Sequence, residues 1–181
     1  MRNHKKFILK NLESQLIDIK NDNHLRNSYN HITNIIKTSI FDYTDLGYEK
    51  INTDLRNNIN VKSEYFLKYG LNKMKSFKGV TYRSAYLDNQ VIKLYWISFN
   101  QKKPICDLAF FSSSKNFAIA SNDFSGNVIF KIESKNGKSI MEISKHKYEE
   151  EILFTSKTKF QITEMLYDHF LRIHNITLIE I

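Results

Sequence analysis

The apolar pattern of the chain changes within one segment, Leu71-Asn-Lys-Met-Lys-Ser-Phe-Lys-Gly-Val-Thr-Tyr-Arg83. Before it, from Phe7 to Met74, apolar residues recur every three or four positions, which is the spacing of amphipathic helices. After Lys78 they stand in short apolar or alternating runs, which is the spacing of strands. The sequence therefore predicts helices in residues 1–78 and strands in residues 79–181.

The helical half contains two clear apolar stripes and two further helices. One stripe comprises Ile8, Leu9, Leu12, Leu16 and Ile19, and the other comprises Tyr29, Ile32, Ile35, Ile36 and Ile40. A further helix is predicted from about Thr44 to Asn57, with Thr44 as its N-cap because a threonine hydroxyl can accept a free backbone N–H. The last helix starts after Ser63 and continues toward Met74.

The second half is predicted to be rich in strands. They cover residues 80–83, 105–112, 127–132, 139–143, 151–154, 159–163 and 176–181. The segment from Asn89 to Ser98 fits either a helix or a strand. Because helices come first and strands follow, the pattern is typical of α+β proteins. We expect one domain, residues 1–181, in which a helical subdomain packs on a largely antiparallel core of two sheets.

The composition is that of a folded protein with a basic charge balance. The 181 residues are 41% hydrophobic and 13% aromatic, so the chain can bury a core. The formal net charge is +8, with 14 basic and 8 acidic side chains in residues 1–78 against 13 and 11 in residues 79–181. The basic residues are interleaved with Asn, Asp and Glu, which favours solvated helix faces over a nucleic-acid interface.

Several classes of protein and site are excluded by simple features. Apolar runs such as Val91 to Trp96 are far shorter than the roughly 20 residues of a membrane-spanning helix. The first ten residues are basic, but their apolar run of three residues predicts no secretory signal. The six histidines show no paired ligand spacing, and Cys106 is the one cysteine, so we expect neither a metal site nor an intramolecular disulfide. We expect a monomer without a membrane partner.

Two predicted strands carry polar side chains that are candidates for a site. The strand over residues 80–83 carries Arg83 among apolar neighbours, which by itself indicates an edge-strand arginine that reaches water. The run Phe110-Phe-Ser-Ser-Ser114 ends a strand, where serines are usually part of a turn. Because side chains alternate along a strand, Ser112 and Ser114 are predicted to share one face.

Three consecutive glutamates, Glu149 to Glu151, run directly into Ile-Leu-Phe. Their charges repel one another, and the last glutamate is carried into a strand whose neighbours favour burial. The i, i+2 relation predicts that Glu149 and Glu151 lie on one side of the chain, about 6.5 to 7 Å apart. Two carboxylates in this arrangement could divide a reaction between them. A solvated acidic turn is the alternative.

The predicted helix from Thr44 to Asn57 carries one more pair of candidates. Asn52 and Arg56 lie four residues apart. Residues at this spacing project from the same face of a helix, so the two side chains could converge on a common anion.

In this order, the motifs resemble those of mono-ADP-ribosyltransferases of the arginine-serine-glutamate class, which is related to the cholera and clostridial toxins. Tyr82-Arg83 is similar to the arginine motif, residues 110–114 to the Ser-Thr-Ser motif, and Glu149-Glu-Glu-Ile-Leu-Phe154 to the Glu-x-Glu motif. The helix Tyr48-Glu-Lys-Ile-Asn-Thr-Asp-Leu-Arg56 resembles the family's Tyr-x-x-Ile-Asn-x-x-Leu-Arg. The resemblance covers about residues 40–181. Two small residues depart from the usual pattern, Ser113 in place of Thr and Ser84 in place of Gly.

The resemblance implies that NAD is the substrate and that the bond between its nicotinamide and ribose is cleaved, without a metal. A fixed carboxylate near the ribose opposes the positive charge of an oxocarbenium-like sugar, and Glu151 is assigned this role. Ser112 would orient the sugar, and Arg83 would hold the phosphates because a guanidinium offers two parallel donors. The resemblance assigns further NAD contacts to Asn52, Arg56, Ser84 and Ser114, and the nicotinamide cover to Phe124, with Phe117 as the competing candidate.

Glu149 predicts the acceptor of the ADP-ribose. In the family, a glutamate at this position goes with arginine acceptors, because a carboxylate can grip a guanidinium through charge-assisted hydrogen bonds. The loop from Ser144 to Tyr148 would contact the target protein. Two alternatives stay open, a catalytically inactive binding module of the same fold and an enzyme that modifies nucleic acid. The implied role is that of an effector or toxin, either cytoplasmic or delivered into a host cytosol without a signal peptide.

Overall fold

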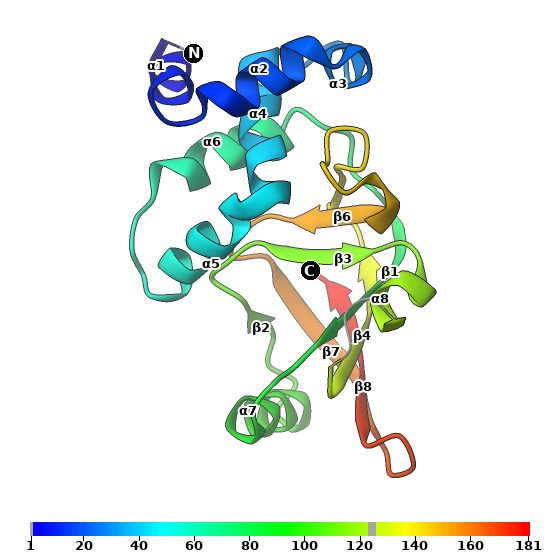
Figure 1. Cartoon of the computed structure of the whole chain (residues 1–181). Coiled ribbons are helices and arrows are strands. Elements are labelled where there is room, and N and C mark those ends of the chain that lie inside the picture. Colours follow the sequence, from blue (N-terminus) through cyan, green and yellow to red (C-terminus); the bar gives the residue numbers. More distant parts are fainter. Residues whose placement is uncertain (1, 123–125) are drawn as a thin grey trace.

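The computed structural model describes residues 2–122 and 126–181, and it has a helical layer packed on a twisted sheet (Figure 1). The helices of the first part of the chain confirm the helical character predicted before Lys78. They are α1 (Arg2–Asn11), α2 (Glu13–Asn21), α3 (Asn23–Asn27), α4 (Asn34–Asp42), α5 (Tyr48–Arg56) and α6 (Lys62–Leu71).

Helices α4 and α5 are joined without a break. Between them, Tyr43–Gly47 form a single π-helical turn, η1. Thr44 therefore lies inside a helical segment, and the prediction that it caps α5 was wrong. Its hydroxyl donates to the carbonyl of Phe41 at 2.8 Å and accepts the N–H of Lys145 at 3.1 Å. Such π-helical turns are rare and are frequent at functional sites.

In the described part of the chain, eight strands form one sheet in the order β2-β7-β8-β4-β1-β3-β6-β5. Only β4 and β8 pair in parallel, and the remaining pairs are antiparallel, as predicted. The strands are β1 (Gly79–Ala85), β2 (Ile105–Cys106), β3 (Phe111–Ser114), β4 (Val128–Ser134), β5 (Lys138–Ser139), β6 (Glu151–Phe154), β7 (Lys159–Asp168) and β8 (Ile173–Glu180).

The two sheets that were expected are two parts of one hydrogen-bonded sheet. β1 pairs with β4 along the whole of Gly79–Ala85, but it pairs with β3 at a single position, Tyr82 opposite Ser114. A part containing β2, β7, β8, β4 and β1 therefore meets a part containing β3, β6 and β5 at a narrow junction. Figure 1 shows β3 and β6 running across the direction of β8.

The ambiguous segment, which lies between β1 and β3 in the chain, is a helix. α7 (Asn89–Asn100) begins after Asp88, whose side chain accepts the N–H of Val91 at 2.8 Å and so caps the first turn. The helix packs against β7. Within residues 2–122 and 126–181, no helix combines the length and the apolar character that a membrane span requires.

Two predicted strands are shorter than expected. The strand predicted over residues 105–112 is interrupted between β2 and β3, where the Asp107 carboxylate accepts the N–H of Ala109 at 2.9 Å. The strand predicted over residues 139–143 ends in β5 at Ser139, and the following residues turn. The Asp107 bond is an example of a local hydrogen bond that competes with a strand ladder.

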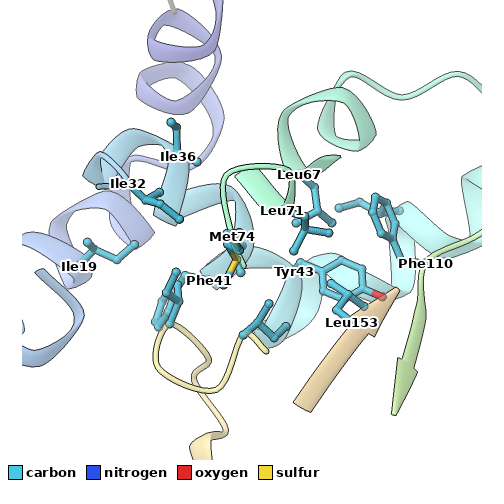
Figure 2. Close-up of a cluster of buried hydrophobic side chains, with 14 of the residues drawn as sticks. Ile19, Ile32, Ile36, Phe41, Tyr43, Leu67, Leu71, Met74, Phe110 and Leu153 are labelled. Atoms are coloured by element: carbon cyan, nitrogen blue, oxygen red, sulfur yellow. The ribbon is translucent and has the colours of Figure 1, made fainter. Parts of the chain in front are cut away.

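Two groups of buried apolar side chains hold the layers together, and β6 belongs to both. The first group joins the helices to β6 and to the segment directly before β3, and it includes Phe41, Leu67, Leu71, Phe110 and Leu153 (Figure 2). The second packs the sheet against α7 and contains the neighbours of Leu153 on either side, Ile152 and Phe154. β6 is therefore buried on both faces. The carboxylate at its start, Glu151, is consequently carried on a strand that is firmly packed.

Candidate active site

A cleft of about 600 Å³ opens between the helical segment η1–α5 and the strands β1, β3 and β6. These elements are far apart in the sequence, and the cleft lies where the two parts of the sheet meet. It brings together most of the residues predicted for the site, namely Asn52, Arg83, Ser84, Ser112, Ser114, Glu149 and Glu151.

Arg83, on β1, links the two parts of the sheet. Its Nη1 donates to the carbonyl oxygen of Ser112 at 2.7 Å, and its guanidinium carbon lies 4.7 Å from the centre of the Phe111 ring. Burial lowers the pKa of Arg83. No carboxylate among the described residues forms an ion pair with it. A partly buried guanidinium without a carboxylate partner can donate hydrogen bonds to an anion in the cleft.

The serines of β3 lie as the strand alternation predicted. In the antiparallel pairing of β3 with β6, Ser114 stands opposite Glu151 and Ser112 stands opposite Leu153. Paired residues share a face of the sheet, so Ser112, Ser114 and Glu151 face the same way. The hydroxyl of Ser113 instead donates to the carbonyl of Ile152 at 3.1 Å and is used within the sheet.

Glu151 is a buried carboxylate with 5% of its surface exposed. Burial is the main reason that its pKa is raised to about 7; a hydrogen bond from Ser112 and the charge of Arg83 oppose this rise, and the neighbouring charge of Glu149 adds to it. The carboxyl group is therefore poised to change its ionisation near neutral pH. A raised pKa inside a cleft is a frequent property of residues that act on substrates.

Glu149 lines the same cleft, but it does not lie on the strand with Glu151. It ends a short 3₁₀ turn, η2 (Lys147–Glu149), and Glu150 has a left-handed backbone with φ of 48°. The strand geometry predicted for the two glutamates was therefore wrong, although both line the same cleft. Glu150 lies outside the cleft lining, and its carboxylate is 3.8 Å from Nζ of Lys115.

Asn52 and Arg56 do not converge in this structure. The Asn52 amide donates to the hydroxyl of Tyr43 at 3.1 Å and accepts the N–H of Phe110 at 3.1 Å. The Arg56 guanidinium donates to both carboxylate oxygens of Asp107, at 3.2 and 2.8 Å, and it is not part of the cleft lining. The sequence spacing could not predict this, because Asp107 is 51 positions away. NAD contacts of both residues remain predictions.

No role was predicted for Tyr43, which lines the cleft. It is 2% exposed, its ring lies 5.5 Å from that of Phe110, and burial raises the pKa of its hydroxyl. Tyr48 and His146 also line the cleft. Tyr43 lies in the π-helical turn, which shifts the phase of the helix, and periodicity alone carries no signal for such a shift.

Of the two candidates for covering the nicotinamide, the structure describes one. Phe124 lies outside the described residues. Phe117 begins α8 (Phe117–Asn122), is half exposed and packs edge-to-face on Tyr82 at 5.3 Å, but it is not among the residues that line the cleft. For the part of the chain that is described, no group of three or more potential ligands is arranged to hold a metal ion.

Comparisons with known proteins point to one family. The family model for NAD:arginine ADP-ribosyltransferases matches residues 39–180. Tre1 of Serratia proteamaculans (strain 568), named an NAD(+)–protein-arginine ADP-ribosyltransferase, is 30% identical over 130 residues, which is 68% of this chain and 27% of Tre1. The chain spans between 15% and 27% of the length of the curated relatives that it matches.

Solved structures support the fold independently of sequence identity. The ADP-ribosyltransferase HopU1 of Pseudomonas syringae pv. Tomato superposes with a TM-score of 0.82 at 18% identity, over 93% of this chain and 87% of HopU1. XopAI of Xanthomonas axonopodis pv. citri, a type III effector, superposes with a TM-score of 0.70 at 16% identity, over 98% of this chain and 78% of that one. These likenesses show that the helical layer and sheet form an ADP-ribosyltransferase fold.

Proposed function

Since the chain belongs to the NAD:arginine ADP-ribosyltransferase family, we propose that it transfers ADP-ribose from NAD to an arginine side chain of a protein. The observation that supports this most strongly is the convergence of Arg83, Ser112 and Glu151 in one cleft. The three residues come from separate strands, and each supplies a different chemical group.

Glu151 would stabilise the reaction centre. When the bond between ribose C1′ and the nicotinamide nitrogen breaks, its electron pair leaves with nicotinamide and positive charge develops on the sugar. A fixed carboxylate at this point lowers the barrier most when it is held in place and shielded from water. Glu151 meets both conditions, because β6 is buried on both faces and Ser112 hydrogen-bonds to the carboxylate.

Arg83 would bind the phosphates of NAD. Among the described residues, its guanidinium donates one hydrogen bond, of 2.7 Å, to the carbonyl oxygen of Ser112. The planar guanidinium has five N–H donors, so further donors can engage an anion. Asn52 would position the cleft wall, because its amide donates to the hydroxyl of Tyr43 and accepts the N–H of Phe110, directly before β3.

Glu149 would select and activate the acceptor. A guanidinium that enters the cleft would donate to the Glu149 carboxylate and would transfer a proton to it as its nitrogen attacks C1′. The preceding loop ends in Tyr148, which is 62% exposed and is free to contact the protein that carries the arginine. We propose that this target is met inside a cell into which the protein is delivered as an effector.

The experiment uses labelled NAD, cell extract and three matched glutamate variants. Glu151→Gln should lower both NAD hydrolysis and transfer by on the order of 10²–10³, the range for one preorganised electrostatic group. Glu149→Gln should lower transfer more than hydrolysis. Glu150→Gln is the control, because this residue lies between the other two but outside the cleft lining, and it should leave both rates within about twofold.

Mass spectrometry of the labelled target should locate ADP-ribose on arginine. Equal loss of hydrolysis and transfer in Glu149→Gln would contradict the division of roles. Label that is released by nuclease would overturn the protein acceptor in favour of nucleic acid.

A further inference from the structure

A second cavity, of about 1080 Å³, lies in the groove between α1 and α6. Figure 1 shows these two helices at the end of the molecule opposite the β7–β8 hairpin. The groove shares no lining residue with the cleft around Glu151. The groove is therefore a separate site from the cleft proposed to bind NAD.

The walls of this groove carry positive charge that nothing in the described protein balances. Arg2, Lys6 and Lys10 line one wall and Lys62 lines the other, whereas no carboxylate is part of the lining. None of these four cations forms an ion pair with any described residue. On α6 itself, by contrast, Lys68 pairs with Glu64 at 2.9 Å.

The three cations of α1 form a regular row. They are spaced four residues apart, so neighbouring charges lie about 6 Å apart along the helix and the row is about 12 Å long. Like charges at this spacing destabilise a helix, and α1 contains no acidic residue that would compensate. The row becomes favourable when negative charges with the same spacing lie beside it.

The floor of the groove is aromatic, and its ring faces are largely occupied. The ring of Phe66 is covered by that of His4, stacked at 4.2 Å, and Phe7 packs on it at 5.0 Å. Phe66 is consequently 7% exposed, while Tyr65 is 67% exposed. Nucleic-acid bases bind to successive free ring faces. The floor instead offers ring edges and one exposed tyrosine, which suit the apolar side chains of a peptide.

We propose that this groove binds an acidic amphipathic helix of a partner protein. Carboxylates at positions i, i+4 and i+8 of such a helix have the same spacing of about 6 Å as Arg2, Lys6 and Lys10. Its apolar face would lie on the aromatic floor, which is the usual way in which a groove recognises a helix. The proposal concerns recruitment of a partner and does not rest on the proposed enzymatic activity.

The test measures binding of a synthetic peptide by fluorescence anisotropy. The probe is a labelled amphipathic peptide of about 18 residues, long enough to form a helix, with glutamates at every fourth position of its polar face. Binding should weaken with added salt. It should also weaken by about tenfold or more in the double variant Lys6→Glu/Lys62→Glu. The control variant is Lys103→Glu, an exposed lysine in the turn after α7, which should bind like the unchanged protein.

Charge exchange provides the decisive control. A peptide with lysine in place of each glutamate should bind the double variant more tightly than it binds the unchanged protein. Thermal unfolding checks that the double variant is folded, and Lys6→Gln/Lys62→Gln replaces it if it is not. Equal binding of a glutamine-substituted peptide, or no effect of either double variant, would overturn the proposal. Tighter binding of a labelled oligonucleotide or of anionic vesicles through the same lysines would overturn it as well.

Discussion

Glu151 combines a buried position with neighbours that act on its charge in opposite directions. Burial, and to a smaller extent the charge of Glu149, disfavour its ionised form, whereas Ser112 and Arg83 favour it, and the resulting pKa lies near 7. The proposed role requires the ionised form. NAD hydrolysis is therefore expected to depend on pH in a range where an ordinary glutamate, with a pKa near 4.5, would be fully ionised.

We predict that kcat/KM for NAD hydrolysis falls as the pH is lowered through about 7. In Glu149→Gln this acid limb should move to lower pH, because the variant lacks the negative charge that raises the pKa of Glu151. A pH profile of kcat/KM for hydrolysis, recorded for the unchanged protein and for Glu149→Gln, measures the acid limb of each. An acid limb that stays in place, or moves to higher pH, would show that the charge of Glu149 does not raise the pKa of Glu151.

The same group should make the stability of the protein depend on pH. Between about 4.5 and 7 the folded state keeps a proton on Glu151 that the unfolded state has released, so the free energy of unfolding falls as the pH rises through this window. At pH 8, Glu151→Gln should therefore be more stable than the unchanged protein by on the order of 2 kcal/mol. Urea unfolding at pH 4.5 and pH 8 tests this, with Glu150→Gln as the reference. A variant that is less stable at pH 8 would contradict the prediction.

At the scale of the elements, the π-helical turn η1 positions the helical wall of the cleft. A glycine occupies its last position, and a Cβ added at Gly47 would lie 2.5 Å from Oδ2 and 2.8 Å from the backbone oxygen of Asp42. The second of these atoms cannot move away without a shift of the helix itself. The turn therefore requires a residue without a side chain at this point.

Gly47→Ala is predicted to lower the free energy of unfolding by about 1–3 kcal/mol, the usual cost of overpacking. It should also raise the KM for NAD, because Tyr43, in the turn, and Tyr48, directly after it, both line the cleft. Gly70→Ala, in α6 and outside the cleft, is the control: an added Cβ there would meet Ile36 at 3.0 Å, and KM should not change. An unchanged KM in Gly47→Ala would show that the turn does not hold the cleft wall.

Local patterns predicted what depends on neighbouring residues and failed where distant ones intervene. The alternation of β3 correctly put Ser112 on the face shared with Ser114, because the period of a strand is a local property. The direction in which the side chains of α5 point was not predictable. The π-helical turn η1 inserts an extra residue before α5, and the spacing of apolar residues does not indicate it. The divergence of Asn52 from Arg56 depends on Asp107, which no spacing on the helix reveals.

At the scale of the whole molecule, the same limit applies to the junction between the two parts of the sheet. Alternation predicted the strands on each side, but the change of direction follows from how few positions β1 shares with β3. With Tyr82 opposite Ser114 as the single register pair, the bond from Arg83 to the carbonyl of Ser112 carries much of the connection. The candidate active site therefore lies at the junction where the two parts of the sheet share a single register pair. Arg83, which is proposed to bind NAD, also links these two parts.

Replacing Arg83 tests whether the site and the junction share this residue. In Arg83→Lys, one ammonium cannot both replace the 2.7 Å bond to the Ser112 carbonyl and offer parallel donors to an anion. We expect the free energy of unfolding to fall by about 1 kcal/mol and the KM for NAD to rise by about tenfold or more. Thermal unfolding with and without ADP-ribose, together with NAD hydrolysis, measures both effects, and Arg26→Lys on exposed α3 is the control. If Arg83 serves both the site and the junction, its replacement must change both the KM and the free energy of unfolding. A higher KM at unchanged stability would therefore assign Arg83 to the site alone, and lower stability at unchanged KM would assign it to the junction alone.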